Sequence, residues 1–164
     1  MSDASIDLAT VDDIPAIMAV ERTPGFEGLV GRWSHEEHAE EMGKPSVRYF
    51  VLRVNGKVSG FTLLQRIGEP DGRVHLKRIA VRRAGQGEGS KLLAAVQLWL
   101  FTETDTNRLD LDVFVENERA RRAYEKAGFQ VEGRLREYHA SPDGGLHDVW
   151  FMSILRREWE AARP

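Results

Sequence analysis

A run of glycines is the first feature of the sequence that could do chemistry. Residues 82–93, RRAGQGEGSKLL, place Gly85, Gly87 and Gly89 at every second position, between a strand-like run and a helix-like run. Glycines let backbone N–H groups approach an anion closely, and the positive end of the following helix favours the same ligand. The loop indicates a site of diphosphate size, although a tight turn whose glycines only make room for packing has the same pattern.

Two nucleotide-binding motifs do not fit this loop. A P-loop needs GxxxxGK followed by Ser or Thr, whereas the order here is Gly-Ser-Lys without the four-residue gap. The dinucleotide fingerprint GxGxxG opens a βαβ unit, whereas Gly85, Gly87 and Gly89 give GxGxG late in an antiparallel context. Neither ATP nor NAD is favoured.

A second motif lies further along the chain, in NERARRAYEKAGF at 117–129. Its spacing puts Asn117, Ala120 and Tyr124 near one face of a helix. Considered as structure only, Ala120, Ala123, Tyr124 and Ala127 form a packing stripe of small residues with a tyrosine at its edge.

Hydrophobic periodicity and turn residues predict the elements that position these motifs. Asn55-Gly56 is a favoured hairpin turn, and Ser34 with Glu37 forms a capping box that starts a short helix. The predicted strands cover 5–9, 47–54, 58–67, 73–81, 108–115, 129–138 and 146–159, the last two joined by a turn at 141–145; the predicted helices cover 10–21, 34–43, 87–103 and 117–128. This order predicts one α+β domain over residues 1–164 with a mixed sheet.

The fourth predicted strand changes phase in its middle. Val74 and Leu76 are apolar on the even positions, whereas Ile79 and Val81 are apolar on the odd ones. A β-bulge near residues 77–78 would reconcile the two halves.

Composition excludes several classes of protein. Lys plus Arg number 23 against 26 Asp plus Glu, a net charge of −3, so no global positive field favours nucleic acid or an anionic membrane. The acidic start is unlike a signal peptide and no apolar stretch reaches the length of a membrane span, so we expect a soluble cytoplasmic protein. The absence of cysteine excludes disulfides, thiolate metal sites and a covalent cysteine intermediate.

The segments RIAVRRAGQGEGSKLL and VFVENERARRAYEKAGFQVEGRLREY together resemble the GNAT superfamily of acyl-CoA-dependent N-acetyltransferases, and the similarity spans most of residues 5–157. The last segments are similar to the branch that includes ribosomal-protein and polyamine acetyltransferases. The resemblance implies a GNAT-like fold with a mixed, mostly antiparallel sheet of about seven strands, about four helices and a bulged fourth strand. It also implies acetyl-CoA as co-substrate, with its pyrophosphate on the glycine loop and its pantetheine arm beside the fourth strand and the helix that starts at Asn117. The implied cofactor-binding residues are Ile79, Val81, Arg82, Arg83, Gly85, Gln86, Gly87, Gly89, Ser90, Asn117 and Tyr124.

Two residues of the loop depart from what a phosphate site would favour. Ala84 stands where the family has Arg or Gln, which removes one side-chain contact to phosphate; Arg82, Arg83 and Lys91 could supply the missing charge. Glu88 would repel the ligand, so we expect its side chain to point away, toward the helix exterior.

Acetyl transfer from a thioester to an amine needs a neutral amine and a proton for the departing thiolate. Without cysteine, direct attack in a ternary complex is the simplest route. Tyr124 is the candidate acid, because an ordinary phenol with a pKa near 10 stays protonated at neutral pH, and its family counterpart has this role. His75 is the candidate base, with Glu116 and Asp112 as rivals and a purely structural histidine as the alternative.

The remaining histidines indicate no metal site. His35 and His38 form HxxH on a short acidic helix, but the motif is not HExxH and has no obvious third ligand. His147 and Asp148 follow the last turn, where we expect structural roles.

The resemblance places the acceptor between the loop joining the first two helices and the last hairpin, next to Phe26, Glu27, Trp33 and Tyr138, with His139 nearby. Glutamates on this side would suit a cationic amine, although a solvated helix face has the same composition.

The predicted function is transfer of an acetyl group from acetyl-CoA to a primary amine, which could be a small molecule, a polyamine or a peptide N-terminus. The sequence leaves open whether the protein forms a homodimer. One alternative is a non-catalytic acyl-CoA-binding regulatory module, which Asn117 and Tyr124 argue against and Ala84 mildly favours. Another is a nucleotide-binding protein that uses the same loop, which the spacing disfavours.

Overall fold

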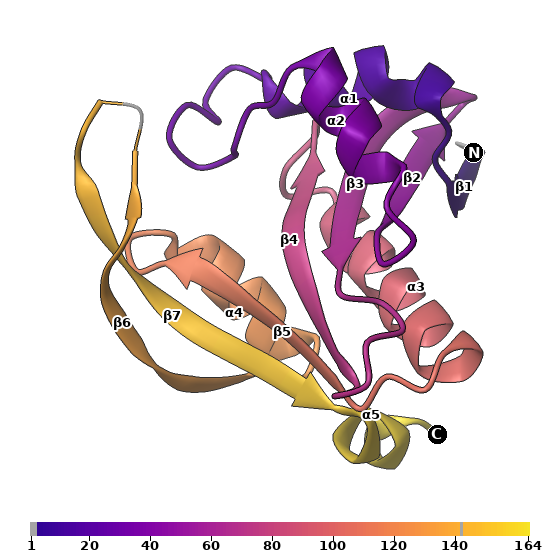
Figure 1. Ribbon diagram of the computed structural model, residues 1–164, viewed down its shortest axis with the longest axis vertical. Helices are drawn as coiled ribbons and strands as arrows, with labels where there is room; N and C mark the ends of the chain where they lie inside the picture. The colour runs from indigo at the N-terminus through magenta and orange to yellow at the C-terminus, as the bar shows by residue number, and fades with distance from the viewer. Residues whose placement is uncertain (1–2, 142) are drawn as a thin grey trace.

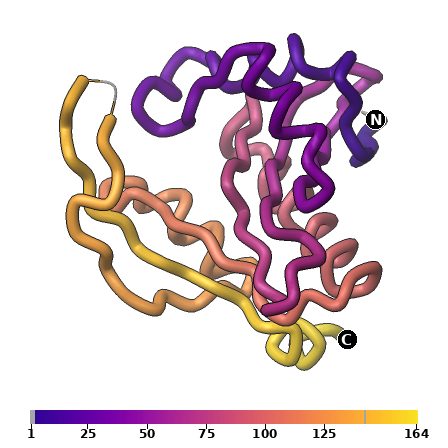
Figure 2. Tube along the Cα trace, viewed as in Figure 1, coloured from indigo at the N-terminus to yellow at the C-terminus, as the bar shows by residue number. Residues whose placement is uncertain are grey.

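The computed structural model describes residues 3–141 and 143–164, so Pro142, part of the predicted turn at 141–145, lies outside it. Its centre is a seven-stranded sheet in the order β1-β2-β3-β4-β5-β7-β6 (Figures 1 and 2), in which only β4 and β5 pair in parallel. The strands are β1 (Ala4–Leu8), β2 (Arg48–Val54), β3 (Lys57–Gln65), β4 (Arg73–Val81), β5 (Arg108–Phe114), β6 (Gln130–Ala140) and β7 (Leu146–Leu155). The helices are α1 (Ile14–Glu21), α2 (His35–Met42), α3 (Glu88–Glu103), α4 (Glu118–Lys126) and α5 (Arg156–Ala162), with a 3-10 turn at Val11–Asp13 before α1. Over the described ranges, no helix is both long and apolar enough to cross a membrane.

Alternation of side chains along the strands gives the sheet two hydrophobic cores. On β2, Tyr49 and Val51 pack into the core shared with α1, whereas Phe50 and Leu52 pack into the core shared with α3. Figure 1 shows α1 and α2 on one face of the sheet and α3 on the other. The predicted α+β fold with a mixed sheet is confirmed.

The two parallel strands diverge soon after they pair. Residues 73–75 of β4 lie beside residues 108–110 of β5, and the last of these pairs joins His75 to Asp110. Beyond it, β4 runs on to Val81 and β5 runs on to Phe114 without pairing to each other. We call this divergence the fork; it leaves backbone groups of both strands facing the space between them.

The predicted bulge in β4 lies at Lys77. Leu63 of β3 pairs with Arg78 and the next residue, Leu64, pairs with Leu76, so Lys77 is the extra residue. The bulge restores the phase, because Leu76 before it and Ile79 after it pack against the same core. The expectation from the sequence is confirmed.

The C-terminal segment differs from the prediction. A single strand was expected over 146–159, but β7 ends at Leu155 and α5 begins at Arg156. The carboxylate of Glu158 accepts a hydrogen bond from the Leu155 N–H at 3.1 Å, which caps the new helix. The ring of Trp159 then packs 5.3 Å from that of Phe101 on α3. An apolar run alone does not distinguish a strand from a strand that turns into a short helix.

Candidate active site

His75 and Asp110 meet at the apex of the fork. Nδ1 of His75 lies 2.6 Å from Oδ1 of Asp110, and Nε of Arg73 donates to the other carboxylate oxygen at 2.6 Å. Burial of Asp110 would raise its pKa, but the hydrogen bonds from His75 and Arg73 outweigh this effect and hold the pKa below its ordinary value. Asp110 therefore stays ionised, and because a carboxylate only accepts, it directs the Nδ1–H of His75 toward itself and leaves Nε2 facing outward.

Asp112, two residues further along β5, joins the fork to the last hairpin. Its Oδ1 lies 2.7 Å from Nε2 of His139 on β6, and its Oδ2 lies 3.7 Å from Nε2 of His75. Asp110 and Asp112 share one face of β5 because strand side chains alternate. Two carboxylates and two imidazoles from three strands thus alternate in a row of polar contacts: Asp110, His75, Asp112 and His139.

Tyr124 extends from α4 into the hydrophobic core on the α3 face of the sheet. Its side chain packs against that core and against Phe129, with ring centroids 5.8 Å apart. Burial, and secondarily the charge of Asp112, raises the pKa of Tyr124 above its ordinary value. The phenol is therefore protonated at any physiological pH.

The glycine loop adopts the backbone conformation that glycine favours. Gly85 and Gly87 have φ values of +81° and +77°, and Gly87 caps the N-terminus of α3. A Cβ built on Gly85 would lie 2.8 Å from Nη2 of Arg119 in the first turn of α4. The loop and the start of α4 are therefore adjacent, and a guanidinium lies beside the loop near the position of Ala84.

The expectation for Glu88 is wrong. Its side chain is buried rather than turned to the helix exterior, and Oε2 accepts a hydrogen bond from the Ser59 hydroxyl of β3 at 3.0 Å. The other oxygen pairs with the guanidinium of Arg83. A carboxylate in the first turn of a helix is stabilised by the helix dipole, and here Ser59 and Arg83 satisfy both of its oxygens inside the protein.

The other residues predicted to bind the cofactor lie on β4, on the glycine loop and on α4. Asn117 caps α4, since its Oδ1 accepts a hydrogen bond from the Ala120 N–H at 3.3 Å. Ile79 and Val81 are half-buried and pack against the α3 core. Gly89 is half-buried in the first turn of α3, and the remaining predicted residues, all exposed in or just after the loop, are Arg82, Gln86 and Ser90.

The predicted acceptor residues come from two separate segments. Phe26 and Trp33, in the loop between α1 and α2, pack against the α1 core. Glu27 is exposed; hydrogen bonds from its own N–H and from that of Gly25 lower its pKa. Tyr138 is exposed on β6, and its ring lies 4.8 Å from that of His139. The structure thus brings Tyr138 into contact with His139, which is linked to Asp112 of β5.

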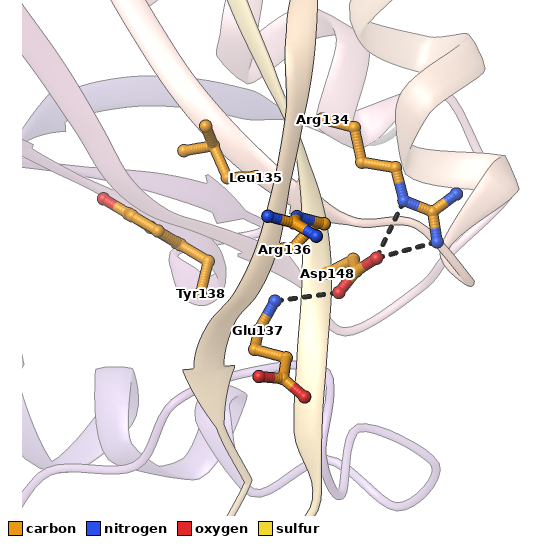
Figure 3. A pocket seen from close by; sticks show the side chains of 6 residues that line it. All are labelled: Arg134, Leu135, Arg136, Glu137, Tyr138 and Asp148. Atoms are coloured by element: carbon orange, nitrogen blue, oxygen red, sulfur yellow. Dashed lines mark hydrogen bonds and ion pairs between the residues drawn. The ribbon is translucent and has the colours of Figure 1, made fainter.

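A bulge in β6 presents Tyr138 (Figure 3). Between the pairs Leu135–Val149 and His139–His147, three residues of β6 lie opposite Asp148 alone. The carboxylate of Asp148 accepts the Glu137 N–H and the Arg134 Nε–H, both at 2.8 Å. These residues line a shallow depression on the edge strand, away from His75 and Tyr124, so we do not regard it as the catalytic centre. The structural role expected for Asp148 fits this geometry.

The other titratable candidates have different surroundings. Glu116 is exposed, 3.6 Å from Nδ1 of His147, whose ring stacks on Phe114. His35 is exposed, whereas His38 is buried and lies within hydrogen-bond distance of Glu21 and Tyr49. The HxxH pair therefore points in two directions, which does not suit a shared metal ion.

Sequence reasoning missed two residues of this site. Asp110, the partner of His75, was visible only as one of the alternating polar positions of a strand, because the residue opposite it could not be identified. Arg119 had no distinguishing signal, since the helix that contains it has several arginines.

Comparison with known proteins identifies the family of the chain. The sequence profile of the acetyltransferase (GNAT) family matches residues 15–129, and the chain belongs to this family. It is therefore classed with the acetyl-CoA-dependent N-acetyltransferases, as the sequence predicted.

The individual relatives are distant. YdaF of Bacillus subtilis, whose name places it among ribosomal N-acetyltransferases, is 27% identical over 68% of this chain, and the match spans only 61% of YdaF. The crystal structure of the ribosomal-protein-S18-alanine N-acetyltransferase from Escherichia coli is 26% identical with a TM-score of 0.79, covering 93% of this chain and 94% of that one. The spermidine N-acetyltransferase of Vibrio cholerae, solved with CoA and spermine, is 23% identical with a TM-score of 0.81, covering 96% and 98%. The last likeness shows the fold alone.

Replacing Asp110 should destabilise the protein in a pH-dependent way. Because Asp110 is a buried carboxylate that holds His75 and Arg73, we expect Asp110→Asn to lower the free energy of unfolding by about 3 kcal/mol at pH 7. The folded-state pKa of Asp110 lies below the unfolded one, so its contribution is present above the ordinary aspartate value of about 4 and is lost as the pH falls through the folded value. Urea denaturation at pH 7, 5 and 3 measures this.

The exposed Asp105→Asn is the matched control and should change stability little at each pH. An Asp110→Asn effect that stayed constant down to pH 3 would contradict the ionised state assigned to Asp110.

Proposed function

We propose that the protein transfers the acetyl group of acetyl-CoA to a primary amine that attacks directly in a ternary complex. The observation that carries the proposal is the apex of the fork, where His75 is oriented by the ionised Asp110. The YdaF and Escherichia coli relatives, named for N-acetylation, support an amine acceptor.

The glycine loop is suited to the pyrophosphate of coenzyme A. Its glycines leave backbone N–H groups accessible, and the N-terminus of α3 adds a positive dipole. Arg119 is placed to supply the charge that Ala84 does not, whereas Arg83 is already paired with Glu88. The free edge of β4 beyond the fork offers backbone groups to the pantetheine amides, in the manner of an added strand.

His75 is the proposed base. With Nδ1–H held by Asp110, Nε2 can take a proton from the incoming ammonium, directly or through water. The negative charge of Asp110 then stabilises the imidazolium that forms. Asp112, close to Nε2, adds a second negative charge that would attract a cationic amine to the same place.

Tyr124 is the proposed acid. Acetyl-CoA, when bound, supplies a thioester, whose cleavage releases a thiolate that needs a proton. The raised pKa of Tyr124 keeps the phenol protonated, so its O–H can donate a hydrogen bond to the sulfur as negative charge develops there. Because the same shift makes the phenol a weaker acid than a thiol, the phenol shares its proton with the departing sulfur, and the released thiolate takes up its own proton from solvent and leaves the phenol neutral.

The acceptor would enter between the α1–α2 loop and the β6–β7 hairpin. Phe26, Glu27 and Trp33 belong to the first segment and Tyr138 to the second, and the two lie on either side of the fork in Figure 1. We propose small primary amines, polyamines or peptide N-termini as acceptors.

A panel of acceptors tests the proposal. Thiol release from acetyl-CoA should be measured with a thiol reagent over alkyl amines, polyamines, amino acids and N-terminal peptides; the protein has no cysteine and gives no background. We expect turnover with at least one class and none without amine. Tight acetyl-CoA binding without turnover on any amine would favour the non-catalytic regulatory module.

Removing the Tyr124 hydroxyl tests the acid. Tyr124→Phe should lower kcat by about 10²-fold, because the thiolate must leave without a positioned proton donor. The KM for acetyl-CoA should change little, since the ring remains in place. Tyr138→Phe is the comparison variant: it removes a phenol from the acceptor side, so any effect should fall on the KM for the amine and not on kcat. Full activity of Tyr124→Phe would exclude the acid role.

Replacing the imidazole tests the base. His75→Gln should lower kcat/KM by about 10²-fold at pH 7, and the residual activity should rise nearly tenfold per pH unit as free amine replaces ammonium. The exposed His35→Gln should retain the wild-type pH profile. If His75→Gln kept both the rate and the profile of the wild type, the base would have to be sought elsewhere.

A further inference from the structure

A buried polar cluster on the α1–α2 face takes no part in the proposed chemistry. Glu21, the last residue of α1, is fully buried, and its carboxylate lies 2.8 Å from Nε2 of His38 and 2.8 Å from Nη1 of Arg78. Nδ1 of His38 lies 2.9 Å from the Tyr49 hydroxyl. Because a buried ion pair is a weak source of stability, the effect of this cluster has to be sought in what it positions.

The cluster holds Trp33 in two ways. The guanidinium carbon of Arg78 lies 4.0 Å from the centre of the Trp33 ring, a cation–π contact. Arg22, whose Nη1 lies 3.5 Å from the Glu21 carboxylate, donates from Nη2 to the Trp33 carbonyl at 3.1 Å. The ring and the backbone of Trp33 are thus both held by arginines that share one carboxylate.

Gly31 allows this packing. A Cβ built on Gly31 would lie 2.5 Å from Nη2 of Arg78, so the guanidinium fits only because residue 31 has no side chain. The backbone φ of Gly31 is not in the left-handed region, so glycine is needed here for space and not for conformation. The loop 22–34 therefore closes over Arg78 at this point.

The bulge in β4 connects this packing to the site. Arg78 lies opposite Leu63 and His75 lies opposite Gln65, two neighbours on one face of β3. Because Lys77 is the extra residue, Arg78 and His75 share the same face of β4. Trp33, stacked on Arg78, therefore lies over the same face of β4 that carries His75.

We propose that Glu21 and Arg78 are positioning residues that hold Trp33 as a fixed wall beside the attacking amine, and so restrict the site to slender primary amines. The proposal rests on the proposed function. A rigid indole beside the reacting nitrogen would exclude amines branched at the adjacent carbon, amino acids and most peptide N-termini among them, and so narrows the proposed acceptors to unbranched alkyl amines and polyamines. A released loop would admit the branched amines.

Gly31→Ala tests the wall without removing any charge. The added methyl should displace the Arg78 guanidinium. The ratio of kcat/KM for propylamine to kcat/KM for isopropylamine should then fall by about tenfold. The KM for acetyl-CoA should stay within about twofold, because the glycine loop is unaffected. Trp33→Leu should give the same loss of preference. Gly43→Ala, whose Cβ meets only ordinary contacts at 3.5 Å, is the matched control and should behave like the wild type.

Limited trypsin digestion provides a second readout that does not require activity. The loop contains the exposed Arg32, and cleavage after it should be about tenfold faster in Gly31→Ala than in Gly43→Ala, because the loop is no longer anchored. Unchanged cleavage would overturn the anchoring. Faster cleavage with an unchanged amine preference would overturn the proposed role of Trp33 in selectivity. An equal loss of rate for both amines would overturn it as well. If the wild-type protein acetylated no amine, both the proposed function and the proposed amine selectivity would be wrong. The digestion experiment would still test whether Arg78 anchors the loop.

Discussion

The divergence of β4 and β5 is the constraint on which the rest of the structure depends. Parallel pairing stops after His75 and Asp110, so each strand continues with backbone groups open toward the other. A sheet that stayed paired would hydrogen-bond these groups internally and leave no edge for a ligand. At the point of divergence the imidazole of His75 lies against the ionised Asp110, with Asp112 at its other nitrogen. The candidate site thus lies where β4 and β5 separate.

Two buried carboxylates organise the two halves of the site in similar ways. Asp110 is held by His75 and Arg73 at the fork, and Glu21 is held by His38 and Arg78 beneath the α1–α2 loop. Each carboxylate contacts one imidazole and one arginine that come from other helices or strands. Charges removed from water are costly unless several donors satisfy them, so such clusters tolerate little displacement. Their common effect is geometric: Asp110 orients the proposed base His75, and Glu21 holds the arginines that fix Trp33.

Sequence patterns predicted an element correctly where residues close together in the sequence determine it. The Asn55-Gly56 hairpin, the bulge in β4 and the glycine cap of α3 depend on residues close in sequence, and the structure contains all of them. The errors occurred where a distant partner decides the outcome. The apolar C-terminal run was expected to continue as a strand, but contacts with α3 and a cap from Glu158 favour α5. Glu88 was expected to point toward the helix exterior, but its carboxylate is buried and accepts a hydrogen bond from Ser59 on β3.

The sequence by itself determined the family, the acetyl donor and the position of the glycine loop, because these depend on short motifs whose spacing is preserved along the chain. It also identified Tyr124 and His75 as candidates, Tyr124 through its family counterpart and His75 through its place at the start of the fourth strand. Only the tertiary structure decided which groups surround them. The pairing of His75 with Asp110, the stacking of Arg78 on Trp33 and the approach of Arg119 to the glycine loop all join residues far apart in sequence. Such contacts follow from strand register and loop path, which no local pattern of residues specifies.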